Sequence, residues 1–152
     1  MMIKNCMKTE VVTITATTTI RAAALLVAER HVGLLPVINQ EGKLVGVIGL
    51  RDLLSLEMPD FFSLVNNLDF ISDFGAVETT RPKAAQIDRP VSALMRQAIT
   101  VPEDCGMLYA YGQMIKHNLT DLPVVSPDGR LVGVVSRVDI AAAILEEWKN
   151  IR

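Results

Sequence analysis

The chain has 152 residues, of which half are hydrophobic and only 5% aromatic, and its 15 basic and 17 acidic side chains give a formal net charge of −2. This length is enough to bury a sizeable core, and the composition predicts an aliphatic α/β core that needs no metal or disulfide. The small net charge excludes a general electrostatic attraction to nucleic acid or to an anionic membrane.

The first third of the chain has the pattern of a strand, a helix, a hairpin and a second helix. A β-branched strand is followed by threonines that can cap a helix, and Gly42 supplies the positive φ of a short turn. A second helix is expected to begin near Gly49. The expected strand, capping segment, helix and hairpin strands are Val11–Thr15, Thr15–Thr19, Ile20–Ala28, Leu35–Asn39 and Lys43–Ile48.

The middle segment, Ser55–Pro90, is too long for an ordinary connection and contains all four phenylalanines. Apolar residues recur there at helical spacing between Met58 and Gly75, which predicts a short amphipathic helix. This helix would cover the chain's own core or make a dimer or partner contact. The absence of Lys and Arg between Asp52 and Thr80 argues against docking on an anionic membrane.

The last third repeats the order of elements seen in the first. Pro127 and Gly129 make its hairpin turn the clearer of the two. The expected elements are a strand at Ala98–Val101, a helix at Glu103–Lys116, strands at Leu122–Ser126 and Leu131–Val135, and a helix from Ser136 to about Lys149. Tyr109, Tyr111 and Trp148 lie on these helices and are interpreted as packing residues.

Residues 13–54 and 100–141 are therefore two copies of one unit, related by a constant offset of 87 residues. The landmarks that match are Pro36 with Pro123, Gly42 with Gly129, Gly46 with Gly133, and Asp52 with Asp139. Such a duplication predicts pseudo-twofold packing, with a ligand site that occurs twice or lies between the halves.

The ordered set L-P-V, turn glycine, L-V-G-V and S-R-V-D, present in related form twice, resembles the CBS domain and its tandem arrangement, the Bateman module. The resemblance covers about residues 3–54 and 91–147. It implies two βαββα repeats packed with pseudo-twofold symmetry. The expected domains are a first repeat at residues 1–54, a Phe-rich, partly helical insert at 55–90 and a second repeat at 91–152. It further implies clefts for adenosine-containing ligands such as AMP, ADP, ATP or S-adenosylmethionine.

Ser136 and Asp139 match the family's Ser/Thr-x-x-Asp signature, which implies that they hold ribose and phosphate. The same two residues also form a capping-box pattern, and both roles can coexist. By resemblance, backbone and apolar groups from the first strand and from the loop before L-P-V contact the adenine. These positions are Ile99, Thr100, Val101, Leu119, Thr120, Asp121 and Pro123, although the strand and edge roles of Thr100 and Pro123 compete with this interpretation. Arg137, one residue into the signature, and Arg130, in the preceding hairpin, are each placed to reach a phosphate, and the alternative is that they are solvated surface arginines.

The first repeat keeps the carboxylate but has Gly49 in place of the signature hydroxyl, which predicts a weaker second site. Arg51 would supply charge where the serine is missing. The remaining positions of this weaker site are Asp52, Thr13, Ile14, Gly33, Leu35 and Pro36.

Catalytic and metal chemistry find no support in the sequence. Cys6 and Cys105 lack metal-binding spacing, and His31 and His117 are too few for a triad or a metal cluster. The chain shows neither a signal-peptide pattern nor an apolar run long enough to span a bilayer, so we expect a cytoplasmic protein.

We therefore expect a non-enzymatic regulatory module without a catalytic cofactor, which senses an adenosine-type ligand and signals to an effector protein. The resemblance implies a homodimer. The alternative is a dimerisation or interaction module whose clefts are vestigial and empty.

Overall fold

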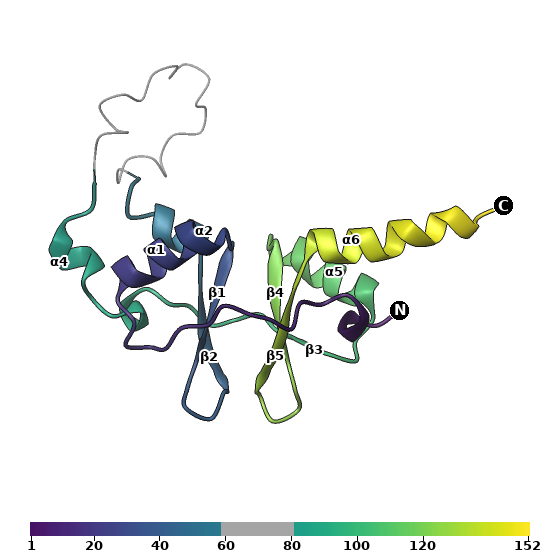
Figure 1. Ribbon diagram of the computed structural model, residues 1–152, viewed down its shortest axis with the longest axis horizontal. Coiled ribbons are helices and arrows are strands. Elements are labelled where there is room, and N and C mark those ends of the chain that lie inside the picture. The colour runs from purple at the N-terminus through teal and green to yellow at the C-terminus, as the bar shows by residue number, and fades with distance from the viewer. Residues whose placement is uncertain (59–80) are drawn as a thin grey trace, which may run out of the picture.

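The computed structural model describes residues 1–58 and 81–152, and the helix expected between Met58 and Gly75 lies largely outside these residues. Each half of the molecule consists of an antiparallel hairpin with helices on one side, and the two halves stand side by side (Figure 1). Residues 1–90 contain η1 (Ile3–Asn5), α1 (Ile20–Arg30), β1 (Leu34–Ile38), β2 (Leu44–Gly49), α2 (Leu50–Leu54) and α4 (Ala84–Ile87) in chain order. Residues 91–152 contain η3 (Val91–Ala93), β3 (Val101–Pro102), α5 (Met107–Lys116), β4 (Asp121–Val125), β5 (Leu131–Ser136), α6 (Arg137–Glu146) and η4 (Glu147–Asn150).

Local sequence signals explain where the helices begin. The Thr19 side chain accepts a hydrogen bond from the Ala22 N–H at 3.1 Å, which confirms a threonine cap at the start of α1. Helix α5 begins at Met107 and not at Glu103 as expected, because a turn closed by the Cys105 N–H and the Pro102 carbonyl precedes it.

The two hairpins have the same register. Leu35 lies opposite Ile48 in the first, and Leu122 lies opposite Val135 in the second. Gly42 and Gly129 have φ values of 78° and 85°, so both turns use the left-handed conformation that glycine tolerates. This confirms the predicted hairpins.

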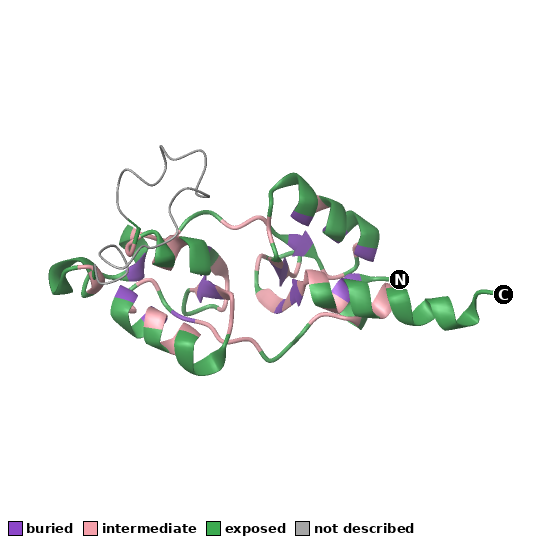
Figure 2. Ribbon diagram, turned by 90° about the horizontal axis from the view of Figure 1, so that it is seen from above, coloured by how far each residue is buried: buried purple, intermediate pink, exposed green. Residues whose placement is uncertain are grey.

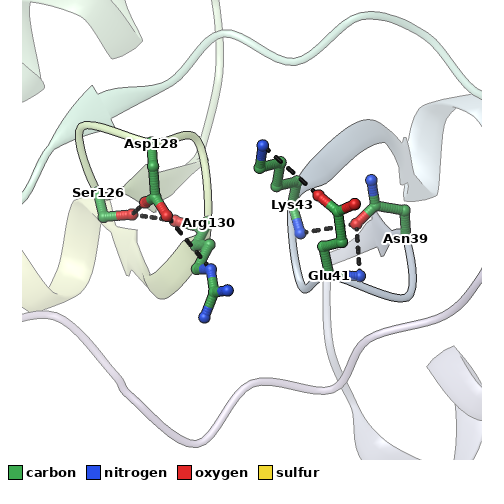
Figure 3. Close-up of polar contacts among 6 residues, drawn as sticks. All are labelled: Asn39, Glu41, Lys43, Ser126, Asp128 and Arg130. Carbon is green, nitrogen blue, oxygen red and sulfur yellow. Dashed lines mark hydrogen bonds and ion pairs between the residues drawn. The ribbon is translucent and has the colours of Figure 1, made fainter.

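The turns of the two hairpins meet. The Leu44 N–H donates to the Gly129 carbonyl and the Leu131 N–H to the Gly42 carbonyl, each at 3.1 Å. Figure 3 shows the polar side chains of both turns, where Lys43 pairs with Glu41 at 3.5 Å and Arg130 pairs with Asp128 at 3.2 Å. The reciprocal backbone bonds fix the pseudo-twofold relation of the halves.

The first strand of each repeat is shorter than expected. In the second repeat, only Val101 and Pro102 pair in parallel with β4, and in the first repeat only Ile14 bridges to Val37. The isolated Ile14 bridge uses both of its backbone groups, since its N–H donates to the Pro36 carbonyl and its carbonyl accepts from the Ile38 N–H.

Each repeat completes the core of the other with the segment that precedes it. Ile3, in η1, is fully buried in the second core together with Val101 and Leu122. Val91, in η3, is fully buried in the first core together with Leu35 and Ile48. Figure 1 shows the N-terminal segment crossing in front of both halves.

The outer faces of the helices are exposed, and the buried residues lie on the strands and the inner helix faces (Figure 2). The interpretation of Tyr109, Tyr111 and Trp148 as packing residues was wrong, because all three are exposed. In α5 the inward positions are taken by Met107, Ala110 and Met114, so the tyrosines point outward. No helix in residues 1–58 and 81–152 is both long and apolar enough to cross a membrane.

Candidate ligand-binding clefts

Ser136 and Asp139 form the capping box that the sequence predicted. The Ser136 N–H donates to Asp139 Oδ2 at 2.9 Å, and the Asp139 N–H donates to Ser136 Oγ at 3.0 Å. In the first repeat, the Gly49 N–H donates to Asp52 Oδ2 at 2.8 Å, but glycine has no hydroxyl to return the bond. Both carboxylates are thus held in one orientation at the start of a helix.

A basic side chain lies beside each of these carboxylates. Lys8 Nζ is 3.8 Å from Asp139 Oδ1, and Arg96 Nε is 3.1 Å from Asp52 Oδ2. The backbones of Lys8 and Arg96 exchange two hydrogen bonds with Val134 and Val47, which fixes the segments that carry them. Each carboxylate is 15% exposed and therefore remains accessible to a small molecule.

The Asp139 carboxylate borders a cavity of about 170 Å³, here called the Asp139 cleft. Its walls come from the N-terminal segment, from the loop between α1 and β1, and from the ends of the second hairpin. The lining residues are Lys8, Glu10, Val11, Val12, His31, Val32, Gly33, Leu34, Asp121, Val134, Ser136 and Asp139.

A second cavity, of about 260 Å³, lies at the start of α2 and is here called the Asp52 cleft, after the carboxylate bonded to Gly49 and Arg96. Its walls come from the start of α2, from Arg96 and from the loop between α5 and β4. The lining residues are Gly33, Leu34, Gly49, Leu50, Arg51, Arg96, Asn118, Leu119, Thr120 and Asp121. Gly33, Leu34 and Asp121 border both clefts.

The structure groups the predicted site residues across the repeats. Ser136 and Asp139 share their cleft with Gly33, from the first repeat, and with Asp121. Leu119 and Thr120 line the other cleft, together with Arg51. The signature of one repeat therefore faces the loop before L-P-V of the other. The prediction that each signature shares a site with the loop of its own repeat does not match this arrangement.

Arg137 does not line either cleft. Its Nε donates to the Leu119 carbonyl at 2.7 Å, and its Nη2 donates to the Met114 carbonyl at 3.3 Å. A cation is favourable at the carboxyl end of a helix, so this arginine fixes the end of α5. The expectation that Arg137 reaches a phosphate finds no support in this geometry.

The remaining predicted contacts, Asp52 among them, are not lining residues of either cleft. Of the buried ones, Ile14, Leu35 and Val101 belong to the two hydrophobic cores. Ile14, Leu35, Pro36, Val101 and Pro123 are buried, Ile99 packs against the second core, and Thr13 and Thr100 line neither cleft.

Several cleft residues were missed by reasoning from the sequence. Lys8 and Arg96 were not predicted because they precede the repeats. They are also 88 residues apart, whereas the matched landmarks of the repeats are 87 residues apart. His31 and Asn118 are equivalent and both have left-handed backbones, with φ of 54° and 53°. Asparagine's tolerance of this conformation was the signal that could have located both positions. Glu10, Val11 and Val12 carried no such signal.

A larger cavity, of about 420 Å³, lies elsewhere, between α1, α2 and α4. Aliphatic side chains line it, and its charged residues Arg21 and Glu57 pair with Asp88 and Arg81 at 2.7 and 3.2 Å. Its lining in residues 1–58 and 81–152 is therefore mostly apolar and fits the polar groups of a nucleoside less well than the two clefts do.

The two cysteines do not have the properties of reactive thiols. Burial raises the pKa of the Cys6 thiol, and the nearby Asp139 carboxylate raises it further. Burial is also the main cause that raises the pKa of Cys105. Within residues 1–58 and 81–152, no group of three or more acidic, His or Cys side chains could hold a metal ion.

The sequence matches the family description "CBS domain" twice, over residues 3–58 and 91–146. The chain belongs to the CBS-domain family. Its two CBS domains are βαββα repeats packed as a pseudo-twofold pair, and this confirms the fold that the resemblance implied.

Among its relatives, an uncharacterised protein of Methanocaldococcus jannaschii, MJ1426, is 30% identical over 72% of this chain and 71% of its own length. The chloroplastic CBS domain-containing protein CBSX1 of Arabidopsis thaliana is 31% identical over 86% of the chain, which spans 57% of that relative.

Two solved structures show the same fold over nearly the whole chain. CBSX2 in complex with AMP has a TM-score of 0.73 and 25% identity, and covers 95% of this chain and 96% of its own. The CBS domain pair of MJ0100, in complex with 5′-methylthioadenosine and S-adenosyl-L-methionine, has a TM-score of 0.71 and 23% identity, and covers 97% and 98% of the two chains.

Proposed function

We propose that this CBS pair is a regulatory module that binds an adenosine-containing ligand in the clefts beside Asp139 and Asp52. Two similar structures support the ligand class, since CBSX2 holds AMP and the MJ0100 pair holds 5′-methylthioadenosine and S-adenosyl-L-methionine. The chain would act without catalysis, as a homodimer in the cytoplasm that signals to a separate effector protein.

The observation that carries this proposal is the orientation of the Asp139 carboxylate. Its Oδ2 is held by the Ser136 N–H, while Oδ1 lies 3.8 Å from Lys8 Nζ and accepts no hydrogen bond from residues 1–58 and 81–152. An ionised carboxylate accepts several hydrogen bonds, so Asp139 can accept from the two neighbouring hydroxyls of a ribose. The capping bond fixes the carboxylate before the ligand arrives, which lowers the entropic cost of binding.

A route for signalling follows from the residues that the clefts share. Gly33, Leu34 and Asp121 border both cavities, and the N-terminal segment that lines the Asp139 cleft also carries Ile3 into the second core. A ligand in either cleft would therefore bias the relative position of the repeats. The bias requires a difference in the ligand's affinity for two states of the pair.

One observation favours the alternative, a dimerisation or interaction module with empty clefts. Large apolar side chains are exposed on the outer helix faces, including Leu25, Leu54, Leu108 and Trp148. Such side chains fit a protein contact whether or not a ligand binds.

Isothermal titration calorimetry with AMP, S-adenosylmethionine and 5′-methylthioadenosine separates the two functions. The variants are Asp139→Asn and Asp52→Asn, in which the amide oxygen still accepts the capping bond but the charge is lost. Asp104→Asn, at an exposed carboxylate outside both clefts, is the matched control.

We expect one of these ligands to bind the wild type and the Asp104→Asn variant equally, and to bind at least one cleft variant about tenfold more weakly. Equal affinity for all four proteins would overturn the role of the carboxylates. Failure of every ligand to bind the wild type would favour the empty interaction module.

A further inference from the structure

The two clefts differ in charge, although their scaffold is duplicated. Arg51 in the Asp52 cleft is equivalent to Val138 in the second repeat, and Arg96 is equivalent to Lys8. The Asp52 cleft therefore has two guanidinium groups where the Asp139 cleft region has one ammonium group. This difference is opposite to the expectation that Ser136 marks the stronger site for a nucleotide.

The two arginines of the Asp52 cleft have free hydrogen-bond donors. Arg96 donates to Asp52 through Nε, and its two Nη groups form no hydrogen bond within residues 1–58 and 81–152. Arg51 is exposed and forms no ion pair within residues 1–58 and 81–152. Guanidinium groups bind phosphate oxygens in a bidentate manner, so a phosphate between Arg51 and Arg96 would receive charge-assisted hydrogen bonds from both.

The Asp139 cleft has the opposite balance of charge. The lining of the Asp52 cleft includes one carboxylate, Asp121, beside its two arginines. Glu10, Asp121 and Asp139 line the Asp139 cleft together with Lys8 and His31, and the Lys8 ammonium already lies beside Asp139. A phosphate here would meet more carboxylates than cations. A ligand with no phosphate avoids this repulsion, and a positively charged group on the ligand would be attracted.

Building on the proposed function, we propose that the clefts select different classes of adenosine compound. A phosphate-bearing adenine nucleotide binds in the Asp52 cleft, with its phosphate held by Arg51 and Arg96. The Asp139 cleft excludes phosphate and takes a neutral or cationic adenosine compound, such as a thioether or a sulfonium.

The test exchanges the equivalent residues between the two clefts. Arg51→Val copies the second repeat, and Val138→Arg copies the first; both side chains are exposed, and Val138 is 75% exposed, so neither substitution disturbs a core. Calorimetric titrations with AMP and with 5′-methylthioadenosine then report affinity and stoichiometry for each protein. Far-UV circular dichroism verifies that each variant is folded.

We expect Arg51→Val to weaken AMP binding at least about tenfold and to leave 5′-methylthioadenosine unchanged, because only AMP carries the phosphate. Asp139→Asn should show the reverse pattern, with weaker binding of 5′-methylthioadenosine. Val138→Arg should strengthen AMP binding beside Asp139, which raises the stoichiometry of AMP above that of the wild type.

The inference is overturned if Asp139→Asn abolishes AMP binding and Arg51→Val does not, or if the two ligands compete for one site in the wild type. In both of those outcomes an adenosine compound still binds, so the proposed function survives. If neither compound binds the wild type, the proposed function itself fails, and the assignment of the clefts fails with it.

Discussion

Gly33 lies so close to Asp121 that a Cβ atom built on the glycine would be 3.3 Å from the Asp121 Oδ2. The two residues come from different repeats and border both clefts. The Thr120 hydroxyl donates to the same Oδ2 at 2.9 Å and fixes the carboxylate in place. A single negative charge is thus positioned between the two candidate sites.

Neutralising that charge should strengthen the binding of a phosphate-bearing ligand. In Asp121→Asn, the amide oxygen can still accept the Thr120 hydrogen bond, but the carboxylate no longer repels phosphate. We expect AMP affinity to rise about three- to tenfold at low salt, with a smaller gain as ionic strength screens the charge. Calorimetry at two salt concentrations measures this, and affinity for neutral 5′-methylthioadenosine should change less. A gain that is independent of salt would contradict the electrostatic explanation.

Ile3 should contribute to stability as a core residue although it lies near the chain end. It is fully buried in the second core, so Ile3→Ala should lower the free energy of unfolding by about 2–5 kcal/mol and Ile3→Val by about 0.5–1.5 kcal/mol. Urea denaturation measures both values. Met2→Ala, at an exposed neighbour, is the control and should have little effect. A negligible change in Ile3→Ala would mean that the N-terminal segment is not anchored.

Gly133 is required for the close approach of the N-terminal segment to β5. A Cβ atom at this position would lie 2.7 Å from the Lys8 carbonyl oxygen, a backbone atom that cannot move independently. Gly133→Ala should therefore cost about 1–3 kcal/mol of unfolding free energy. Gly112→Ala, on the exposed face of α5 with open space around it, should instead stabilise by about 0.5–1 kcal/mol. Thermal unfolding of the two variants should shift the midpoint in opposite directions.

The hydroxyl of Ser136 should stabilise the protein in the absence of any ligand. It accepts the Asp139 N–H at the start of α6, and its loss in Ser136→Ala should cost about 1 kcal/mol. Ser136→Gly, which copies the first repeat at Gly49, should cost only a few tenths of a kcal/mol. Urea denaturation of ligand-free protein distinguishes them. Equal stability of Ser136→Ala and the wild type would leave ligand binding as the only role of the hydroxyl.

The cysteines should react slowly with alkylating agents near neutral pH. Burial raises the pKa of Cys6 and Cys105, so the reactive thiolate forms only at higher pH than in a free cysteine. Because the folded state keeps the thiol protons to a higher pH than the unfolded state does, the two thiols contribute to the free energy of unfolding. This contribution is fully present below the pKa of the unfolded thiols. It is lost as the pH rises through the folded pKa. Iodoacetamide labelling followed by mass spectrometry, in native buffer and in urea, measures the protection. Labelling at equal rates in both would contradict it.

The scaffold was largely predictable because its signals are local. Turn glycines, the L-P-V strands and the Ser136 capping box each depend on neighbours in the sequence, and the structure confirms them. The first strands were overestimated, because β-branched residues such as those around Ile14 favour extended backbone whether or not a partner strand is available.

The clefts were less predictable, because they form between segments that are far apart in the chain. The carboxylate of Asp139 could be identified from its motif, but its facing loop at Gly33 belongs to the other repeat. Arg137 was predicted to contact a phosphate from its position next to Ser136. In the structure its guanidinium group donates to the Leu119 and Met114 carbonyls, which are about 20 residues away in the sequence. Which specific residues bind a ligand stays a prediction.

The exchange of Ile3 and Val91 between the cores has a consequence for folding. Neither repeat can complete its hydrophobic core from its own contiguous sequence, so neither is a complete folding unit. The pair should therefore unfold in one cooperative transition, with the same midpoint for probes in either half. Selection that acts on the stability of one repeat then acts on the other as well, which ties the duplicated halves together even where their cleft residues have diverged.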